Sequence, residues 1–505
     1  MIRQPIALRA SNARVALATL TLLAAAACVP DSSPPPTSDP GASPPLTRLV
    51  AVRGSRPGIF DAAGRQVVLR GVNFNHLGDY FQSDPSLPTV APLAADDWDD
   101  VAATGASVIR LVTTWSAWQP TRGTLDGAYL ERVRAAVAEA NARGLYVVID
   151  MHQDAWSKFV FTPRDRSCPA GTRPQIGWDG APAWATFTDD AETCTPGGRE
   201  DSPAVRKAWE SFYGNRDGVR DELAALWGLI AREFAADAGV AGYDLLNEPG
   251  TSGDPDATVT GLAAFYRSAV SAIRAAEAQQ GSPGHIVFFE PTVFAGLVPF
   301  DWTADPNVVF ASHNYFESIG PSVPGLLDLS FPLFDLVQAL YQTTLWTGEY
   351  GSFAAPSANE EWMARFARLE DQHLRSGGAW WQWEQECGDP HDVAGAWPPS
   401  PEWVANQQAS CGNARFVVTT CVRRGYARAA PGRITSVADP ACDGRLSVTG
   451  STQAPSTADL WIPSDVDVAP QVTGDGLGAV AARRVGGGWR LDVSVAGDYR
   501  IDVAP

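Results

Sequence analysis

The sequence predicts an α/β protein, a (β/α)8 TIM barrel followed by a small C-terminal β-sandwich domain. Three observations lead to this fold class. The chain has 505 residues, enough for a barrel and a second domain. Eight short apolar runs alternate with helical patterns between residues 67 and 383. After about residue 412, helical periodicity stops and period-two runs appear, such as Leu491, Val493 and Val495.

The eight apolar runs are the predicted barrel strands. They are nearly continuous in hydrophobicity, as strands buried on both faces should be. They are Val67–Phe74, Val108–Trp115, Tyr146–His152, Gly242–Asn247, Ile286–Glu290, Val308–Tyr315, Thr344–Glu349 and Gly378–Trp383. Eight strand–helix alternations favour a closed barrel over an open doubly wound sheet. Because no Gly-x-Gly-x-x-Gly follows the first run, dinucleotide binding is not expected.

Amphipathic segments between these runs predict the surrounding helices. One helix has Leu130, Val133, Val137 and Ala140 on a single face, with Gly144 as its stop. A second helix is expected from Pro203, behind Ser202 as its cap, to about Phe234.

The first 48 residues predict export. Residues 1–28 have the basic start and the short apolar run of a signal peptide, and Cys28 after three alanines suggests the lipoprotein type. Plain secretion with cleavage in the alanine run is the alternative. Residues 29–48 form a Pro- and Ser-rich linker. We therefore expect an extracellular or cell-surface lipoprotein, tethered to the membrane through a lipidated Cys28, with a barrel at 49–411 and a sandwich at 412–505.

Charge and cysteine content narrow the functional classes. The net charge of −19 opposes binding to nucleic acid. Apart from Cys28 there are six cysteines, an even number that suggests disulfides in an exported chain. The simplest pairs are Cys168 with Cys194, Cys387 with Cys411, and Cys421 with Cys442.

Polar and aromatic residues gather at the carboxyl ends of the predicted strands, which form the active face of a barrel. They are Asn73, Arg110, His152, Asn247, Glu248, Glu290, His313, Tyr315, Glu349 and Trp383. Glycoside hydrolysis needs two carboxyl groups, one to protonate the leaving oxygen and one to attack the anomeric carbon or activate water. In such a cleft Arg110 and Tyr315 would keep the attacking carboxylate ionised, and Trp383 would stack beneath a sugar ring.

Two motifs resemble glycoside hydrolase family 5, over roughly residues 65–390. They are LLNEP at 245–249 and TGEYG at 347–351. The resemblance implies that Asn247 binds the sugar 2-hydroxyl, that Glu248 is the acid/base and that Glu349 is the nucleophile. It makes Glu290 a supporting partner rather than the nucleophile. Arg110, His152, His313, Tyr315 and Trp383 occupy other recurrent positions of the family.

Two further segments resemble the endoglycoceramidase branch of this family. They are IDMHQDAWSKF at 149–159 and WWQWEQECGDP at 380–390. The resemblance implies a retaining enzyme that needs no metal or other cofactor and cleaves between a glycan and ceramide, or acts on related glycolipids. It also implies that Asp154 binds the sugar.

Two features leave alternatives open. The segment GLLDLSFPLFDLVQAL at 325–340 has too many apolar residues for one core-facing stripe. It is either an exposed face suited to an acyl chain or a helix packed on the barrel with a partly buried underside. Trp178 and Trp184, in the segment between Cys168 and Cys194, either shape the cleft or pin their loop.

We therefore predict a monomeric, retaining β-glycosidase that hydrolyses glycolipids by double displacement. The alternatives are an endo-β-glucanase or mannanase acting on polysaccharide, an exo-type glucosylceramide or steryl-glucoside hydrolase, and a non-catalytic carbohydrate-binding lipoprotein.

Overall fold

The structure is a computed structural model that describes residues 45–82, 88–293, 302–319, 323–351, 356–385, 414–415 and 420–505. These residues belong to one unit, Ser43–Pro505. The expected signal peptide, Cys28, most of the linker and the Cys387–Cys411 pair lie outside the described residues.

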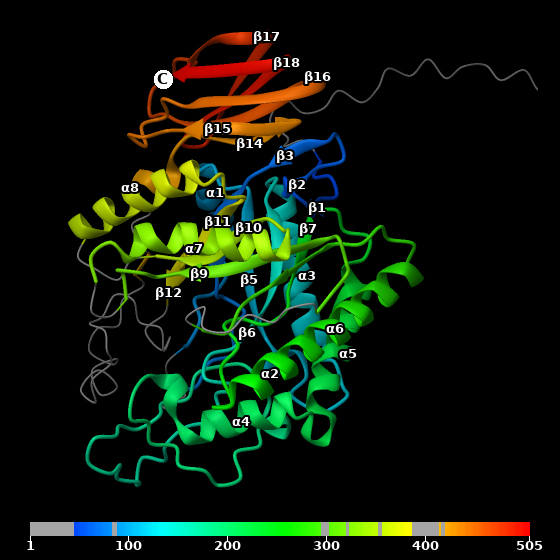
Figure 1. The fold of residues 1–505 in the computed structure, drawn as a ribbon, viewed down its shortest axis with the longest axis vertical. Coiled ribbons are helices and arrows are strands. Elements are labelled where there is room, and N and C mark those ends of the chain that lie inside the picture. Colours follow the sequence, from blue (N-terminus) through cyan, green and yellow to red (C-terminus); the bar gives the residue numbers. More distant parts are fainter. Residues whose placement is uncertain are drawn as a thin grey trace, which may run out of the picture. The chain divides into compact units, whose positions relative to one another are not determined.

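Eight parallel strands close into a barrel in the order β10-β11-β4-β5-β6-β7-β8-β9 (Figure 1). The strands are β4 (Leu69–Phe74), β5 (Val108–Thr114), β6 (Tyr146–His152), β7 (Val240–Asp244), β8 (Ile286–Phe289), β9 (Val308–Asn314), β10 (Leu345–Tyr350) and β11 (Gly377–Trp380). Every residue of β4, β5 and β6 is buried, as their continuous hydrophobicity predicts. The predicted barrel is confirmed.

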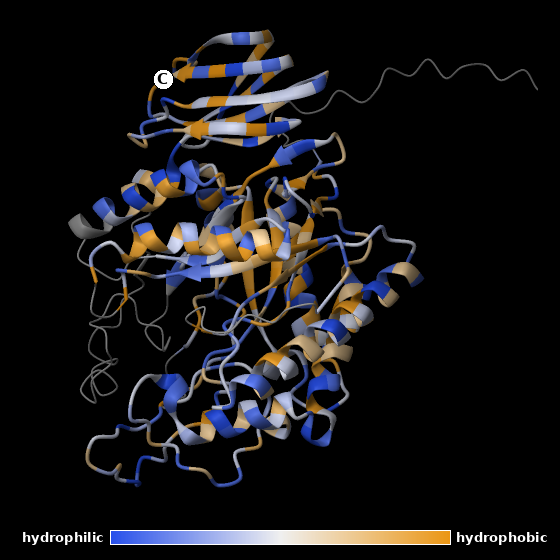
Figure 2. Cartoon of the chain, viewed as in Figure 1, coloured by the Kyte–Doolittle hydropathy of each residue, from blue (hydrophilic) through white to orange (hydrophobic). Residues whose placement is uncertain are grey.

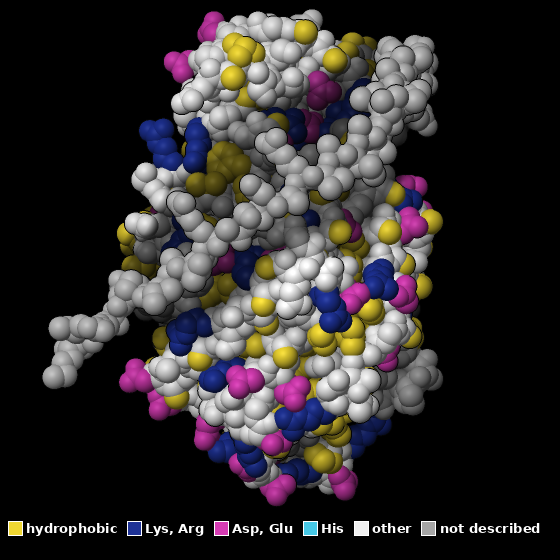
Figure 3. All heavy atoms as spheres, turned by 90° about the vertical axis from the view of Figure 1, so that its right-hand side faces the viewer, with side chains coloured by type: hydrophobic (Ala, Val, Ile, Leu, Met, Phe, Trp, Pro, Cys, Tyr) yellow, Lys and Arg dark blue, Asp and Glu magenta, His cyan; other side chains and the backbone are white. Residues whose placement is uncertain are grey.

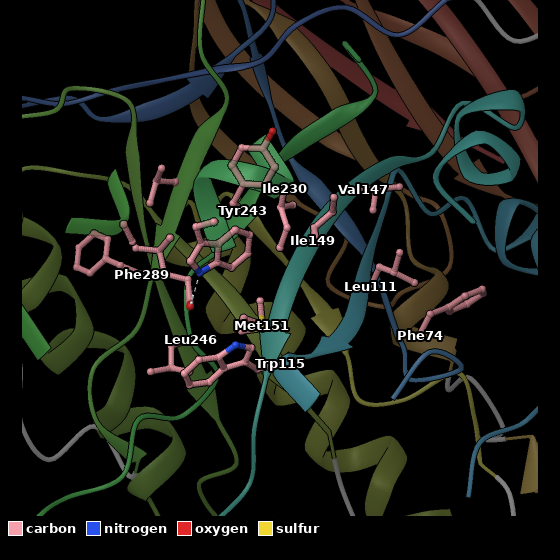
Figure 4. Close-up of a cluster of buried hydrophobic side chains, with 14 of the residues drawn as sticks. Phe74, Leu111, Trp115, Val147, Ile149, Met151, Ile230, Tyr243, Leu246 and Phe289 are labelled. Carbon is pink, nitrogen blue, oxygen red and sulfur yellow. Dashed lines mark hydrogen bonds between the residues drawn. The ribbon is translucent and has the colours of Figure 1, made fainter. Parts of the chain in front are cut away.

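Alternation along the strands explains how a hydrophobic barrel carries a polar site. Successive side chains point to opposite faces of a strand. Leu111, Val147 and Ile149 belong to the core cluster that also includes helix residues (Figure 4). Val108 and Val148 belong to a separate cluster made almost entirely of strand residues. Residues two and four positions after Val108 and Val148 point the same way, into the barrel, nearer to the carboxyl ends of the strands.

The helices of the barrel unit are α1 (Ala95–Ala103), α2 (Trp115–Trp118), α3 (Gly127–Ala142), α4 (Pro203–Tyr213), α5 (Val219–Phe234), α6 (Pro255–Gln279), α7 (Leu326–Tyr341) and α8 (Pro356–Gln372). The prediction for α3 is confirmed. The single helix expected from Pro203 to Phe234 is wrong, because the chain forms two helices there. Asn215 and Gly218 have φ of 54° and 80°, a left-handed backbone that an α-helix does not contain.

The C-terminal domain is an antiparallel sheet that also includes the N-terminal strands of the described chain. Its path is β1-β2-β3-β14-β16-β18-β17, with β15 pairing β16. The strands are β1 (Val50–Val52), β2 (Gly58–Phe60), β3 (Arg65–Val67), β14 (Tyr426–Pro431), β15 (Arg433–Ala438), β16 (Ser447–Pro463), β17 (Gln471–Val485) and β18 (Gly488–Ala504). The remaining short strands are β12 (Glu384–Gln385) and β13 (Ala414–Arg415), which pair with each other. Residues 50–67, which the sequence assigned to the barrel, therefore form part of this sheet.

Buried arginines join the sheet domain to the barrel. Arg424 donates to Glu370 and Asp371 of α8 at 2.6 and 2.8 Å, and Arg70 of β4 reaches the same two carboxylates at 3.1 and 2.7 Å. Arg428 donates to the backbone carbonyl of Ala106 at 2.6 Å. Because buried charges are stable only when paired, these contacts hold the two parts in one arrangement.

A long insertion links β6 to α4. The Cys168–Cys194 disulfide closes it, and Cys421–Cys442 closes a second loop near the sheet, so two of the three predicted pairs are confirmed. Among the described residues, no helix combines the length and apolarity of a membrane span. Acidic and basic side chains are interspersed on the face shown in Figure 3.

Candidate active site

Arg110 is the centre of the site. It lies on β5, points into the interior of the barrel and is fully buried. Its guanidinium donates hydrogen bonds of 2.8–3.2 Å to six side chains: Asn73, Asp150, Asp244, Asn247, Glu290 and Glu349. Burial alone would lower the pKa of Arg110, but the surrounding carboxylates raise it well above its usual value. The Arg110 guanidinium therefore connects side chains from several barrel strands and fixes their relative positions.

Glu349, near the end of β10, has a donor on each carboxylate oxygen. Arg110 donates to Oε1 at 2.8 Å, and the Tyr315 hydroxyl donates to Oε2 at 2.9 Å. Burial, and then the charge of Glu349, raise the pKa of Tyr315 well above its usual value, so the phenol stays a neutral donor. The two donors fix the position of the Glu349 carboxylate and stabilise its negative charge.

Glu248 follows β7 on a sharp turn. Its φ is 37°, a left-handed conformation that costs a non-glycine residue about 1–3 kcal/mol. Its backbone N–H donates to Oε2 of Glu290 at 2.9 Å, which holds the turn. Burial raises the pKa of Glu290 to about 8. Glu290 thus supports the backbone of Glu248, consistent with the supporting place that the sequence resemblance gave it.

Two cations contact the Glu248 side chain. His313 Nδ1 lies 2.9 Å from Oε1, and Arg199 Nη2 donates to Oε2 at 3.2 Å. Burial would raise the pKa of Glu248, but the hydrogen bond and charge of His313, with the charge of Arg199, lower it. For His313, burial acts downward on the pKa, and the charges of Glu290 and Glu349 outweigh it and raise the pKa.

The spacing of the two glutamates matters for chemistry. One carboxylate oxygen of Glu248, one of Glu349 and a nitrogen of His313 all lie within 4.8 Å of one another. Retaining glycosidases place their two carboxyl groups about 5–5.5 Å apart, whereas inverting enzymes need about 6.5–9.5 Å to admit a water. The arrangement suits direct attack by one glutamate.

A second polar group lies beside this pair. His152 Nδ1 is 2.8 Å from Oδ2 of Asp150, and the amide of Asn247 lies 3.4 Å from His152 Nε2. The ring of Trp381 stacks on His152 at 5.3 Å with an interplanar angle of 11°. Trp381 also packs with Tyr315, which bonds Glu349. These side chains make one wall of the site.

Trp383, predicted to stack beneath the sugar, is placed elsewhere. Its indole N–H donates to Oδ1 of Asp97 in α1 at 3.2 Å, and its ring stacks on Phe74. Trp381 packs instead against Tyr315, the hydrogen-bond donor to Glu349. Residues 380–383 are Trp-Trp-Gln-Trp, and β11 ends at Trp380. Beyond the strand, side chains no longer alternate regularly between its two faces, so the sequence could not show which tryptophan enters the site. The other predicted site residues are brought together.

Asp154 lies at the edge of the site and is ion-paired with Arg199, which sequence reasoning missed. No motif marks Arg199, since it lies in an insertion of irregular structure. The buried Trp178 ring packs against Arg199, whose guanidinium lies 4.5 Å from the ring centre, and so holds this part of the loop in place.

Three groups of His, Asp and Glu in the described part of the chain lie close enough to share a metal ion. One of them is Glu248, His313 and Glu349. There, Arg110 and His313 already supply positive charge beside the two glutamates. That the chemistry needs no metal stays a prediction.

A model of the family described as Cellulase (glycosyl hydrolase family 5) matches residues 60–322. The chain belongs to glycosyl hydrolase family 5. This match includes Arg110, His152 and His313 on their barrel strands and Glu248 after β7.

Individual relatives narrow the likeness. The chain is 31% identical over 292 residues to endoglycoceramidase I of Rhodococcus hoagii (strain 103S), covering 54% of each protein. It is 26% identical over 282 residues to an endoglycoceramidase of Cyanea nozakii, covering 48% of this chain and 51% of that one. The chain thus spans about half the length of the curated relatives it matches.

Solved structures are similar over a longer stretch. A crystal structure of endogalactoceramidase superimposes with a TM-score of 0.81 and 38% identity, covering 91% of this chain and all of that one. Endo-glycoceramidase II from Rhodococcus sp., in a ganglioside GM3 complex, gives a TM-score of 0.68 at 21% identity, covering 89% of this chain and all of that one. The second likeness shows the fold alone.

Proposed function

We propose that this protein is a retaining β-glycosidase that hydrolyses the bond between the glycan and the lipid of a glycolipid. The observation that carries the proposal is the pair Glu248 and Glu349, with oxygens within 4.8 Å of each other and separate donors on each carboxylate. The similarity to endogalactoceramidase supports the choice of substrate class.

In the proposed mechanism the two glutamates carry the two steps of double displacement. Glu349 attacks the anomeric carbon while Glu248 gives its proton to the leaving oxygen, and a glycosyl-enzyme forms. Glu248, now ionised, then takes a proton from water, which attacks the anomeric carbon and releases Glu349. Arg110 and Tyr315 hold the nucleophile through both steps.

The glycone-binding residues follow from the wall beside this pair. We assign Asn247 to the sugar 2-hydroxyl, and His152 and Asp154 to neighbouring hydroxyls. Trp381, rather than Trp383, is the surface on which the sugar ring stacks, because it lies beside Tyr315.

Helix α7 supports a lipid aglycone. It is packed on the barrel through one face, and it also has an exposed apolar face. One face is buried through Leu327, Phe331, Phe334 and Tyr341. The opposite face exposes four leucines, Leu329 at 59%, Leu333 at 60%, Leu336 at 68% and Leu340 at 58%. Helix α7 is apolar along much of its length (Figure 2). Its acids are neutralised, since Asp328 pairs with Arg365 and Asp335 pairs with Arg375. An uncharged apolar stripe of this kind suits acyl chains or a bilayer surface.

We propose that the protein is exported as a monomer and held at the membrane by a lipidated Cys28. The basic start, the apolar run and the Pro- and Ser-rich linker support this location. Mass spectrometry of the mature N-terminal peptide tests it. A diacylated Cys28, and release of a Cys28→Ala variant into the soluble fraction, are expected, whereas an unmodified N-terminus within the alanine run would show plain secretion.

The function is tested with the purified unit Ser43–Pro505 in detergent. A ganglioside, a glucosylceramide and a soluble β-glucan are offered separately, and products are identified by mass. Intact oligosaccharide plus ceramide is the expected result. Monosaccharide from glucosylceramide alone would make the enzyme exo-acting. Turnover of the glucan alone would overturn the lipid assignment and leave an endoglucanase.

A further inference from the structure

Arg199 has a fixed position at the edge of the site. It begins the short helix Arg199–Asp201 at the end of the insertion between β6 and α4, five residues after Cys194 of the disulfide. Its guanidinium lies on the buried ring of Trp178. The disulfide and the cation–π contact therefore hold this side chain where it meets the barrel.

One nitrogen of Arg199 joins two carboxylates. Nη2 bonds both Oδ1 of Asp154 and Oε2 of Glu248, the latter at 3.2 Å. Nε lies 3.3 Å from Oε1 of Glu200. Only 20% of the side chain is exposed, so solvent screens these interactions weakly. Arg199 is thus the bridge between the insertion and the proposed acid/base.

The charges around Glu248 come from several elements of the fold. The titratable groups that face it are Arg199, Asp154, Glu200, Asp150, Glu290, His313, Tyr315 and Glu349. The two cations occupy different oxygens of Glu248, His313 on Oε1 and Arg199 on Oε2. His313 also contacts Glu290 and Glu349, at 3.2 and 3.4 Å, so its charge is shared with the rest of the site.

Double displacement makes opposite demands on Glu248. The first step needs a protonated acid, and the second needs an ionised base. A cation on Oε2 favours the ionised form, so the Arg199 contact assists the second step and opposes the first. When Glu248 takes up a proton the attraction weakens, and Arg199 still has Asp154 as its partner.

We propose that Arg199 is a positioning residue that biases Glu248 toward its base form, bridging Glu248 and Asp154 when Glu248 is ionised and keeping its contacts with Asp154 and Glu200 when Glu248 is protonated. The contact between the insertion and the acid/base is then made and broken once in each turnover. This inference rests on the proposed role of Glu248 and is independent of which β-glycoside is the substrate.

The test is the pH dependence of kcat/KM for Arg199→Gln, measured on whichever glycolipid or glucan the wild type cleaves. An opposite charge at this range lowers the pKa of a carboxyl group by about 1–3 units. The basic limb of the profile is therefore expected to move by about one pH unit or more to higher pH. Arg199→Lys keeps the positive charge, so its basic limb is expected to lie closer to that of the wild type than the limb of Arg199→Gln does.

The matched control is Arg206→Ala. Arg206 lies in α4 and pairs with Asp201 on the exposed surface at 2.8 Å. Its loss is expected to leave the limb in place. If Arg199→Gln lowered activity equally at all pH values with the limb unmoved, the residue would be a structural support and the proposal would fail.

A second measurement needs no substrate. In protein labelled with 13C at glutamate carboxyl groups, the Glu248 signal is identified by its loss in Glu248→Gln. The pH at the midpoint of its titration is expected to rise in Arg199→Gln and to stay unchanged in Arg206→Ala. An unchanged midpoint in Arg199→Gln would overturn the proposal, whereas inactivity of the wild type on glycolipids would overturn only the proposed substrate.

Discussion

Removing the Tyr315 hydroxyl tests how the site supports Glu349, the proposed nucleophile. In Tyr315→Phe the ring keeps its packing against Val112 and Trp381, and the 2.9 Å hydrogen bond to Oε2 of Glu349 is lost. Hydrogen bonds to charged groups contribute about 1.5–3 kcal/mol. At about 1.36 kcal/mol per factor of ten, kcat/KM is expected to fall by about 10- to 160-fold.

The fall should stop short of complete loss, because Arg110 still donates to Oε1 of Glu349 at 2.8 Å. The assay is steady-state hydrolysis at the pH optimum, with the thermal unfolding midpoint measured in parallel. Tyr129→Phe is the matched control, since it deletes a buried hydroxyl that donates to the Leu77 carbonyl at 2.7 Å. It should lower stability and spare activity. Less than about a threefold fall for Tyr315→Phe would refute the reasoning.

Three further predictions concern the pair Glu248 and Glu349, the buried Glu290, and the exposed leucines of α7. Glu349→Gln is expected to lower turnover by more than about a thousandfold, because no nucleophile remains, whereas Glu248→Gln should still hydrolyse aryl glycosides with activated leaving groups; near-wild-type rates for Glu349→Gln would disprove the assignment. Burial raises the pKa of Glu290 from 4.5 to about 8, so the folded protein binds the extra proton and stability falls as the pH rises through that window. Thermal midpoints of Glu290→Gln and wild type should therefore differ more in favour of the variant at pH 8 than at pH 4.5, and a pH-independent difference would contradict this sign. On α7, Leu333→Glu with Leu336→Glu should reduce hydrolysis of glycolipid in vesicles about tenfold and leave a soluble substrate unaffected, and equal losses on both would point to misfolding instead.

The barrel and most of its site could be predicted from the sequence for one physical reason. A strand buried on both faces must be mostly apolar along its length, so a charged residue inside such a run, like Arg110 in β5 or Glu349 near the end of β10, is visible against it. The carboxyl ends of parallel barrel strands meet at one face, so these residues were expected together. The disulfides were readable as neighbouring pairs in sequence.

Features set by the path of the chain beyond a strand or helix end were not readable. Of the tryptophans beyond β11, Trp381 packs against Tyr315 and Trp383 donates a hydrogen bond to Asp97, and no periodicity extends past the strand to distinguish them. The break between α4 and α5 depends on left-handed residues at Asn215 and Gly218, within an otherwise helical pattern.

The sequence by itself determined the barrel, the identity of its polar strand ends and the pair Glu248 and Glu349, because these depend on local hydrophobicity and on short motifs. The tertiary structure alone decided that β1–β3 join the C-terminal sheet and that Arg199 reaches Glu248. The first is a pairing between segments more than 350 residues apart, since Val67 pairs with Ala429. The second comes from an irregular loop whose path is set by a disulfide and by Trp178. Contacts of this kind depend on the closure of distant segments, and no local pattern in the chain encodes them.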